Sequence, residues 1–273
     1  MWRRLIRNRT TVAGMIIVGA IVLMAMFAPF IAPHDPVTQN LAHTLRPPGR
    51  EYLMGTDLLG RDLLSRIIHG SRISLLISLV AVTVAVVVGI FLGVISGYYE
   101  GKVDTIGTVF TNLLLAFPMV LLAILIVAIL GPGIENTIIA VAFPSVPIFA
   151  RLMRGSVLST KTSEYVESAK SLGASDLRII VHHIMPNCMA PIIVQGSLRT
   201  ATILLTVAGL SFLGLGVQPP TPEWGVLVSE GRVFLRTAPW VTIFPGLAIM
   251  FAILGLNLLG DGLRDVLDPR LKT

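Results

Sequence analysis

Charged residues are scarce in this chain of 273 residues, and their scarcity argues against an ordinary soluble domain. Only 13% of the residues are charged, whereas about a quarter are charged in a typical soluble protein. Hydrophobic residues account for 54%, and the mean hydropathy is +0.82. This composition predicts a membrane protein.

Cysteine is almost absent, which limits both disulfide and metal chemistry. A single cysteine, Cys188, cannot form a disulfide within the chain. We expect it to be a small buried residue at the inner end of a span rather than a reactive thiol. No HExxH motif or cysteine pair is present, and the adjacent His182 and His183 would point about 100° apart on a helix. We therefore predict no metal site.

Catalytic and nucleotide-binding motifs are also missing. Gly101-Lys102 is followed by Val103 and lacks an upstream glycine-rich run, so no phosphate-binding loop is present. There is no GxSxG motif, and no span pairs acidic residues as ion-coupled carriers usually do. We expect a transport subunit and not an enzyme, with any energy supplied by another subunit. The net charge of +6 is assigned to lipid headgroups and topology, because no basic patch with interleaved aromatics predicts a nucleic-acid partner.

Long apolar runs are what the chain has in abundance. A membrane-spanning helix needs about 20 apolar residues. Six runs meet this length approximately, and they define an all-α membrane protein with one transmembrane domain, residues 12–272, after a short N-terminal segment, residues 1–11. The predicted spans are residues 12–32, 73–97, 106–130, 135–151, 190–216 and 239–260.

The basic residues predict the orientation of these spans. With the N-terminus in the cytoplasm, thirteen Lys and Arg residues fall inside and seven outside, which favours a multi-pass protein with both termini cytoplasmic. The outer loops are then residues 33–72 and 217–238. In the first, residues 61–70 have the spacing of a short helix that either lies along the interface or caps the bundle. In the second, dense prolines argue against helix, and Trp224 suits an interfacial belt with Trp240.

Two features inside the spans suggest specific contacts. Gly89, Gly93 and Gly97 share one helix face, which allows close approach of a neighbouring helix of this chain or of another subunit. Arg199 is the one basic residue well inside a span. It either snorkels to the interface or faces an aqueous pathway.

A polar island, residues 153–189, lies between the fourth and fifth spans. Such a stretch must lie outside the lipid. Ser163 can cap a helix there, Glu164 favours its positive end and Gly173 can end it. Tyr165, Ala169 and Leu172 would share one face. Spacing alone favours a generic amphipathic surface helix.

The motifs of the chain resemble those of a known transporter family. Glu167-Ser168-Ala169, followed three residues later by Gly173, is similar to the EAA loop of permease subunits of binding-protein-dependent ABC importers. Three further stretches resemble the C-type subunit of the dipeptide, oligopeptide and nickel branch. They are Met54-Gly55-Thr56-Asp57 with Gly60-Arg61-Asp62, then Ser211-Phe212-Leu213-Gly214, and finally Asn257-Leu258-Leu259-Gly260-Asp261-Gly262 with Asp268-Pro269. Two departures are Ser168 at an alanine position and His183 at the first position of the downstream Ile-x-Leu-Pro element.

The resemblance implies a coupling role for residues 163–173. They would dock as a cytoplasmic helix on an ATPase subunit, through Glu164, Tyr165, Glu167, Ser168, Ala169 and Gly173. The implied assembly contains a paired B-type permease, two cytoplasmic ATPase subunits that bind ATP and Mg²⁺, and a periplasmic or extracellular substrate-binding protein. It would lie in the bacterial cytoplasmic (inner) membrane, and this chain would bind no cofactor itself.

Function and substrate keep alternatives at this stage. A secondary transporter, a channel or a membrane scaffold would share the six spans but would not need the docking helix. Di- and oligopeptides are the expected substrates, and nickel or metallophore chelates and glutathione remain alternatives.

Overall fold

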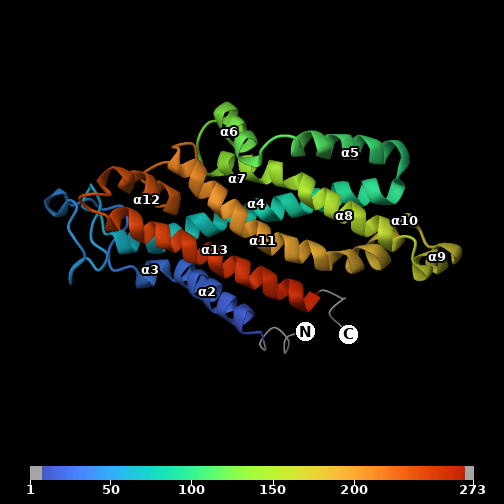
Figure 1. The fold of residues 1–273 in the computed structure, drawn as a ribbon, viewed down its shortest axis with the longest axis horizontal. Helices are drawn as coiled ribbons and strands as arrows, with labels where there is room; N and C mark the ends of the chain where they lie inside the picture. The colour runs from blue at the N-terminus through green and yellow to red at the C-terminus, as the bar shows by residue number, and fades with distance from the viewer. Residues whose placement is uncertain (1–7, 268–273) are drawn as a thin grey trace.

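Helices α2 to α13 follow one another in a computed structural model that describes residues 8–267, with the longest connection, residues 32–62, between α3 and α4 (Figure 1). The basic residues Arg3, Arg4, Arg7, Arg270 and Lys272 and the predicted motif residues Asp268-Pro269 lie outside the described residues. The α-helices are α2 (Arg9–Met26), α3 (Ala28–Ile31), α4 (Leu63–Tyr99), α5 (Gly101–Leu115), α6 (Met119–Leu130), α7 (Ile134–Ala142), α8 (Val146–Thr160), α9 (Glu164–Ser171), α10 (Asp176–Arg178), α11 (Met185–Phe212), α12 (Trp224–Gly231) and α13 (Trp240–Leu267). Short 3-10 turns occur at Leu41–His43, Phe143–Ser145 and Arg232–Phe234, and a π-helical segment at Ile179–Ile184.

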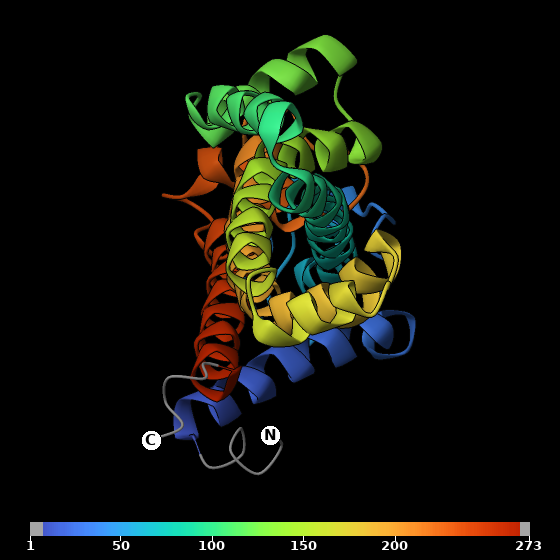
Figure 2. The same cartoon turned by 90° about the vertical axis from the view of Figure 1, so that its right-hand side faces the viewer.

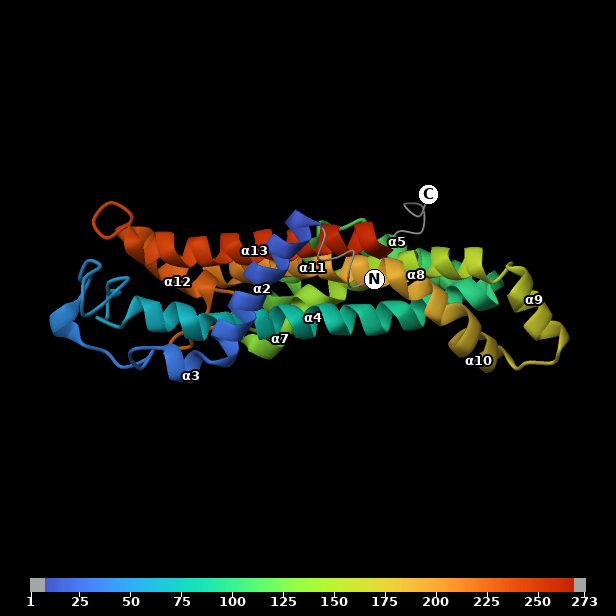
Figure 3. The same cartoon turned by 90° about the horizontal axis from the view of Figure 1, so that it is seen from below.

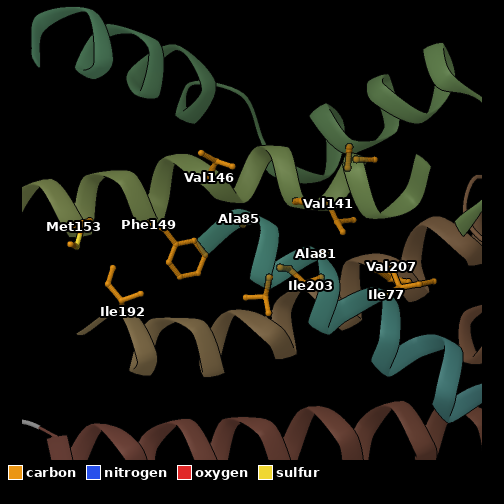
Figure 4. Packing of buried hydrophobic residues seen from close by; sticks show 14 of the residues in the cluster. Ile77, Ala81, Ala85, Val141, Val146, Phe149, Met153, Ile192, Ile203 and Val207 are labelled. Carbon is orange, nitrogen blue, oxygen red and sulfur yellow. The ribbon is translucent and has the colours of Figure 1, made fainter. Parts of the chain in front are cut away.

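The core lies where α4, α7, α8 and α11 meet. Their inward side chains form one cluster of buried residues, part of which Figure 4 shows. Phe149 of α8 and Ile203 of α11 are fully buried there beside Ala81 and Ala85 of α4. The small alanines leave room for the larger side chains, as close packing requires. Many large apolar residues elsewhere are exposed, as expected for helices that face lipid.

Helix α2 crosses the side of this bundle and lies against α13 (Figure 3). A Cβ atom at Gly14 would lie 2.6 Å from the Leu259 nitrogen, and one at Gly262 would lie 2.1 Å from the Thr11 Oγ1 atom. Glycine at these positions therefore lets the two backbones approach closely.

Contacts between helix ends sort those ends onto two faces of the molecule. On the face that carries α9, which Figure 2 shows, Asn8 Nδ2 donates to Asp265 Oδ2 at 3.1 Å and Tyr98 Oη donates to Asp176 Oδ1 at 2.7 Å. On the opposite face, the Gly133 amide donates to the Gly216 carbonyl at 3.1 Å. The start of α2 and the end of α13 are thus on the same face, so the number of crossings between them must be even.

This parity decides between two counts of the spans. Five helical segments are long and apolar enough to cross a membrane within residues 8–267, and six if α5 and α6 count as one bent span. Because α2 begins and α13 ends on one face, we count α5 and α6 together as the sixth crossing. The fold is therefore all-α with six crossings.

The third crossing is not the continuous helix over residues 106–130 that the sequence predicted. It bends by 90° between α5 and α6, at Ala116-Phe117-Pro118. Proline has no N–H to donate and disfavours helical backbone at the residue before it, which explains the break at Phe117.

Other bounds also differ from those predicted. The fourth crossing runs from Ile134 to Thr160 and continues nine residues past the predicted end at residue 151. The fifth crossing starts at Asp176, so the polar island between them shortens to about fifteen residues. Proline at the starts of the 3-10 turn and of α8 is tolerated there because the first helical N–H groups have no partner within the helix.

Residues 61–70 do not form a separate interfacial helix. They lead into α4 and form its first turns, and Leu63, Ile67 and Ile68 are buried below α12. Neither alternative for a short helix is correct, because residues 63–70 are the first turns of the 37-residue helix α4. Trp224 was also predicted wrongly as an interfacial residue. It is fully buried at the start of α12, and its Nε1 donates to the Ile67 carbonyl at 3.0 Å.

Candidate functional site

Helix α9 projects from one end of the bundle, beyond the ends of α4 and α8 (Figures 1 and 3). It spans Glu164–Ser171, shorter than the predicted rod of residues 163–173. Ser163 occupies the N-cap position with extended backbone, but its side chain makes no capping hydrogen bond. Gly173 follows the helix with φ +80°, and its amide donates to the Lys170 carbonyl at 3.0 Å. Glycine adopts this left-handed conformation without steric cost and so ends the helix.

The inner side of α9 is fixed to the bundle through Val166. This side chain is buried, whereas its neighbours along α9 are mostly exposed. Asn187 Nδ2 of α11 donates to Tyr165 Oη at 3.1 Å, which links α9 to the start of α11. A hollow of about 630 Å³ remains between α9 and the end of α4.

Apolar side chains in α9 and just after it are exposed to solvent. Leu172 is 88% exposed, Leu177 72% and Tyr165 45%. Glu164, Glu167 and Ser168 are exposed beside them, and Ala169 is half-buried. The Ser168 hydroxyl donates to the Glu164 carbonyl of its own helix at 2.8 Å. This surface therefore combines exposed apolar side chains with two carboxylates.

The three predicted glycines lie in the contact between α4 and α8. A Cβ atom would be 2.5 Å from the Phe149 Cβ atom at Gly89, 2.5 Å from the Ala150 carbonyl oxygen at Gly93, and 3.0 Å from the Arg154 carbonyl oxygen at Gly97. The neighbouring helix that they accommodate thus belongs to this chain.

Arg199 lies half-buried near the middle of α11. Its Nη2 atom donates to the Met119 sulfur of α6 at 2.7 Å, and its buried Nε atom has no hydrogen-bond partner. No carboxylate of residues 8–267 lies within 4 Å of its guanidinium. The side chain therefore does not complete an ion pair within the described chain.

An ion cluster at the opposite end of the molecule was not predicted. Asp57 Oδ2 accepts from Arg61 Nε at 2.6 Å and also contacts Arg66 Nη1. Glu230 of α12 accepts from the same two arginines, at 3.1 and 2.9 Å. Asp57, Arg61 and Arg66 are buried. The cluster fastens the outer loop and the start of α4 to α12.

Glu223 forms a second buried polar contact beside that cluster. Its carboxylate accepts from the Ser74 hydroxyl at 2.9 Å and from the Val226 amide at 3.1 Å, and so caps α12. Burial raises the pKa of the Glu223 carboxyl, although these hydrogen bonds oppose the shift. The charged residues of both features are visible in the sequence, in or near the motif of residues 54–62 and next to the prolines before Glu223. Their pairing could not be predicted, because Glu230 and Ser74 lie more than a hundred residues from the residues that they contact.

Several named transport proteins are similar to this chain in sequence. The chain is 46% identical over 272 residues to the dipeptide transport system permease protein DppC of Alkalihalophilus pseudofirmus, covering 100% of this chain and 90% of the relative. It is 45% identical to the di/tripeptide transport system permease protein DppC of Pseudomonas aeruginosa, covering 99% and 91%. It is also 45% identical to the glutathione transport system permease protein GsiD of Escherichia coli, covering 99% and 90%.

Solved structures show the same fold at low sequence identity. A chain of the MetNI methionine ABC transporter in inward-facing conformations matches with a TM-score of 0.61 and 15% identity, covering 74% of this chain and 96% of that chain. A chain of an amino acid ABC transporter with histidines matches with a TM-score of 0.55 and 17% identity, covering 72% and 91%.

Two family models match separate parts of the chain. Residues 1–48 match the N-terminal transmembrane domain of oligopeptide transport permease C. Residues 89–273 match the binding-protein-dependent transport system inner membrane component. With this match over most of its length and relatives at 45–46% identity, the chain belongs to the family of inner membrane permease components of binding-protein-dependent transport systems.

Proposed function

We propose that this chain is a permease subunit of an ATP-driven importer for di- and oligopeptides. Together with a paired B-type permease it forms the translocation path across the bacterial cytoplasmic membrane. The names of these relatives support peptides as the substrate class, and glutathione, named for a relative of 45% identity, is itself a small peptide.

The exposed apolar end of α9 is the observation that carries the proposed coupling. Leu172, which follows α9, and Leu177 of α10 are exposed outside the bundle, whereas Val166 of α9 is buried. A helix that is attached on one side and apolar on the other can transmit a push between two proteins. In this proposal α9 seats on a cytoplasmic ATPase subunit, with Glu167 as its polar anchor.

The other partners follow from the same assignment. Two ATPase subunits bind and hydrolyse ATP with Mg²⁺, and this chain binds neither. A periplasmic or extracellular binding protein delivers the substrate to the outer loops. Both termini of this chain lie in the cytoplasm, on the same side as α9.

Substituting Gly173 tests the coupling. Gly173→Trp adds a bulky side chain beside Leu172 and strains the left-handed backbone, by about 1–2 kcal/mol. Since a Cβ atom at Gly173 meets nothing within 4 Å, the bundle itself accommodates the change. We expect the variant to assemble normally in the membrane with the paired permease. The purified complex should still hydrolyse ATP, but this hydrolysis should no longer drive peptide uptake into proteoliposomes.

Gly131→Trp is the matched control. Gly131 also has a positive φ, +89°, and open space around a Cβ atom, but it lies at the opposite face of the molecule. At φ 89° and ψ 165° the backbone of Gly131 is at least as demanding for a non-glycine residue, and this variant should still keep its coupling ratio of ATP hydrolysed to peptide imported. Unchanged uptake in Gly173→Trp, or a wild-type complex without copurifying ATPase subunits, would refute the proposed function and favour a secondary transporter or channel.

A further inference from the structure

The hollow between α9 and the end of α4 separates the docking helix from the longest helix of the molecule. Its volume is about 630 Å³. Tyr98 and Tyr99 of α4 line one side of it, and Val166 and Glu167 of α9 and Asp176 of α10 line the other. Where this space is open, a displacement of α9 is not passed to α4 by direct packing. Contacts that bridge the hollow therefore decide whether α4 follows α9.

A hydrogen bond between Tyr98 and Asp176 joins the two sides of this hollow. Tyr98 Oη donates to Asp176 Oδ1 at 2.7 Å, and the half-buried Tyr98 side chain also packs against the main core cluster. A hydrogen bond to a carboxylate is roughly twice as strong as one between uncharged groups. A second link, the salt bridge between Lys161 and Glu100, lies just beyond the ends of α8 and α4. The Glu100 side chain is 53% exposed, and exposed ion pairs contribute little.

Asp176 belongs to the same structural unit as α9. Val166 of α9 is buried in one cluster with Ile179 and Ile180, which begin the π-helical segment three residues after Asp176. Helix α9 and Asp176 are thus fixed to the same short segment, so a movement of α9 carries Asp176 with it. Because Asp176 begins the fifth crossing and Tyr98 lies one residue before the end of the second, their hydrogen bond joins these two crossings beside α9.

Helix α4 is an uninterrupted connection from this contact to the opposite face of the molecule (Figure 3). Its 37 residues contain no proline, and at 1.5 Å per residue they extend about 56 Å. The fifth crossing is less regular, because it begins with π-helical turns at Ile179–Ile184 and has Pro191 inside α11. Proline removes an internal hydrogen bond and bends a helix. A displacement at Asp176 is therefore transmitted more rigidly through α4 than along its own crossing.

We propose that Tyr98 is a positioning residue of the coupling, whose hydrogen bond with Asp176 passes a displacement of α9 on to α4. The inference rests on the proposed function and deepens it by naming the contact that transmits the movement. Near its other end α4 holds Arg66, which is buried against Asp57 of the outer loop and Glu230 of α12. The movement thus reaches the outer loop, to which the proposed binding protein delivers substrate. A docked binding protein acts on the ATPase subunits through the same bond, because a contact that transmits displacement in one direction also transmits it in the other.

Removing one hydroxyl group tests this role. Tyr98→Phe keeps the aromatic ring but deletes the hydrogen bond to Asp176. The complete complex is reconstituted in proteoliposomes with its binding protein and a dipeptide that the wild-type complex imports. We expect the ratio of ATP hydrolysed to dipeptide imported to rise at least about threefold. Stimulation of ATP hydrolysis by the loaded binding protein should fall by a similar factor, while copurification of the ATPase subunits stays unchanged.

Tyr99→Phe is the matched control. Tyr99 is the adjacent residue on α4, it is 56% exposed, and its hydroxyl makes no hydrogen bond to the residues that the structure describes. The same chemical change at this position should leave the ratio of ATP hydrolysed to dipeptide imported at the wild-type value.

Variants of Asp176 provide the second measurement. Asp176→Ala should raise the ratio as much as Tyr98→Phe does, and the double variant should be no worse than either, because all three lack the same bond. Asp176→Asn should stay close to the wild-type ratio, since an amide oxygen can still accept from the tyrosine hydroxyl. A wild-type ratio in Tyr98→Phe, an equal rise in Tyr99→Phe, or additive effects in the double variant would overturn the inference. Loss of the ATPase subunits on purification of Tyr98→Phe would assign this residue to assembly alone and overturn it as well.

Gly173→Trp separates failure of this inference from failure of the proposed function. If Gly173→Trp uncouples ATP hydrolysis from uptake and Tyr98→Phe does not, the docking role of α9 stands and the inference alone fails. Normal uptake in Gly173→Trp refutes the proposed function, and the inference falls with it.

Discussion

Single glycines determine how closely the longest helices of this protein pack. Gly93 of α4 faces α8 so closely that a Cβ atom would lie 2.5 Å from the Ala150 carbonyl oxygen and 2.7 Å from the Met153 Cβ atom. Such distances are shorter than van der Waals contacts allow. The atoms that a Cβ atom would meet belong to the backbone or to the base of a side chain. One methyl group at this position must therefore push the two helices apart.

Gly93→Ala should destabilise the protein by about 1–3 kcal/mol, the usual cost of overpacking a filled core. The measurement is the midpoint of thermal unfolding in mild detergent, followed by size-exclusion chromatography. Gly209→Ala in α11 is the matched control, because a Cβ atom there meets nothing within 4 Å and alanine favours helix by about 0.5–1 kcal/mol. If both variants unfold at the wild-type temperature, the α4–α8 contact is looser than the structure shows.

Residue-level prediction from the sequence succeeded where the signal was local and periodic. The spacing of Gly89, Gly93 and Gly97 predicted a close contact, and Gly173 was identified as a helix end from its residue type alone. The sequence could not tell whether α8 or another subunit would face the glycines. Nor could it predict that Trp224 is buried, because its partner, the Ile67 carbonyl, lies 157 positions away.

At the scale of elements, the outer loop is fastened to the bundle by charge. Arg66 is fully buried, and it bridges Asp57 of the loop to Glu230 of α12 together with Arg61. Removing one partner from a buried ion cluster leaves uncompensated charge, which costs roughly 3–5 kcal/mol.

Arg66→Met should therefore lower the midpoint of thermal unfolding by more than about 5 °C. Arg46→Gln breaks the Arg46–Glu51 pair in the same loop, whose side chains are about half exposed, and should cost at most about 1 kcal/mol. Equal unfolding temperatures for the two variants would show that the buried cluster contributes no more than a surface pair.

The limits of the elements were harder to predict than their number. Hydropathy located all six crossings, because each contains a long apolar run. It placed the end of the fourth too early, since Arg151 and Arg154 look like the edge of a span. In the structure Asp104 pairs with Arg154 and the helix continues to Thr160. Hydropathy did not predict the 90° bend at Phe117, because Pro118 lies inside a single apolar run of the sequence.

At the scale of the whole molecule, topology depends on how the bent pair α5–α6 is counted. The hydrogen bond between Asn8 and Asp265 places the two ends of the described chain on one face, and this requires an even number of crossings. If α5 and α6 merely dipped into the membrane and returned, α5 and α7 would begin on the same side. The contact of Gly133 with Gly216 at the far face argues against this arrangement.

Labelling in spheroplasts can decide between these topologies. In a Cys188→Ser background, Lys102→Cys marks the start of α5 and Glu135→Cys marks the start of α7, and both positions are exposed. With α9 in the cytoplasm, a membrane-impermeant maleimide should label Glu135→Cys in intact spheroplasts and Lys102→Cys only after permeabilisation. Labelling of Lys102→Cys alone before permeabilisation would invert the proposed orientation. Identical behaviour of the two thiols would mean that α5–α6 does not cross. The end of α4 and the segment after α9 would then lie on opposite sides of the membrane, against the contact of Tyr98 with Asp176.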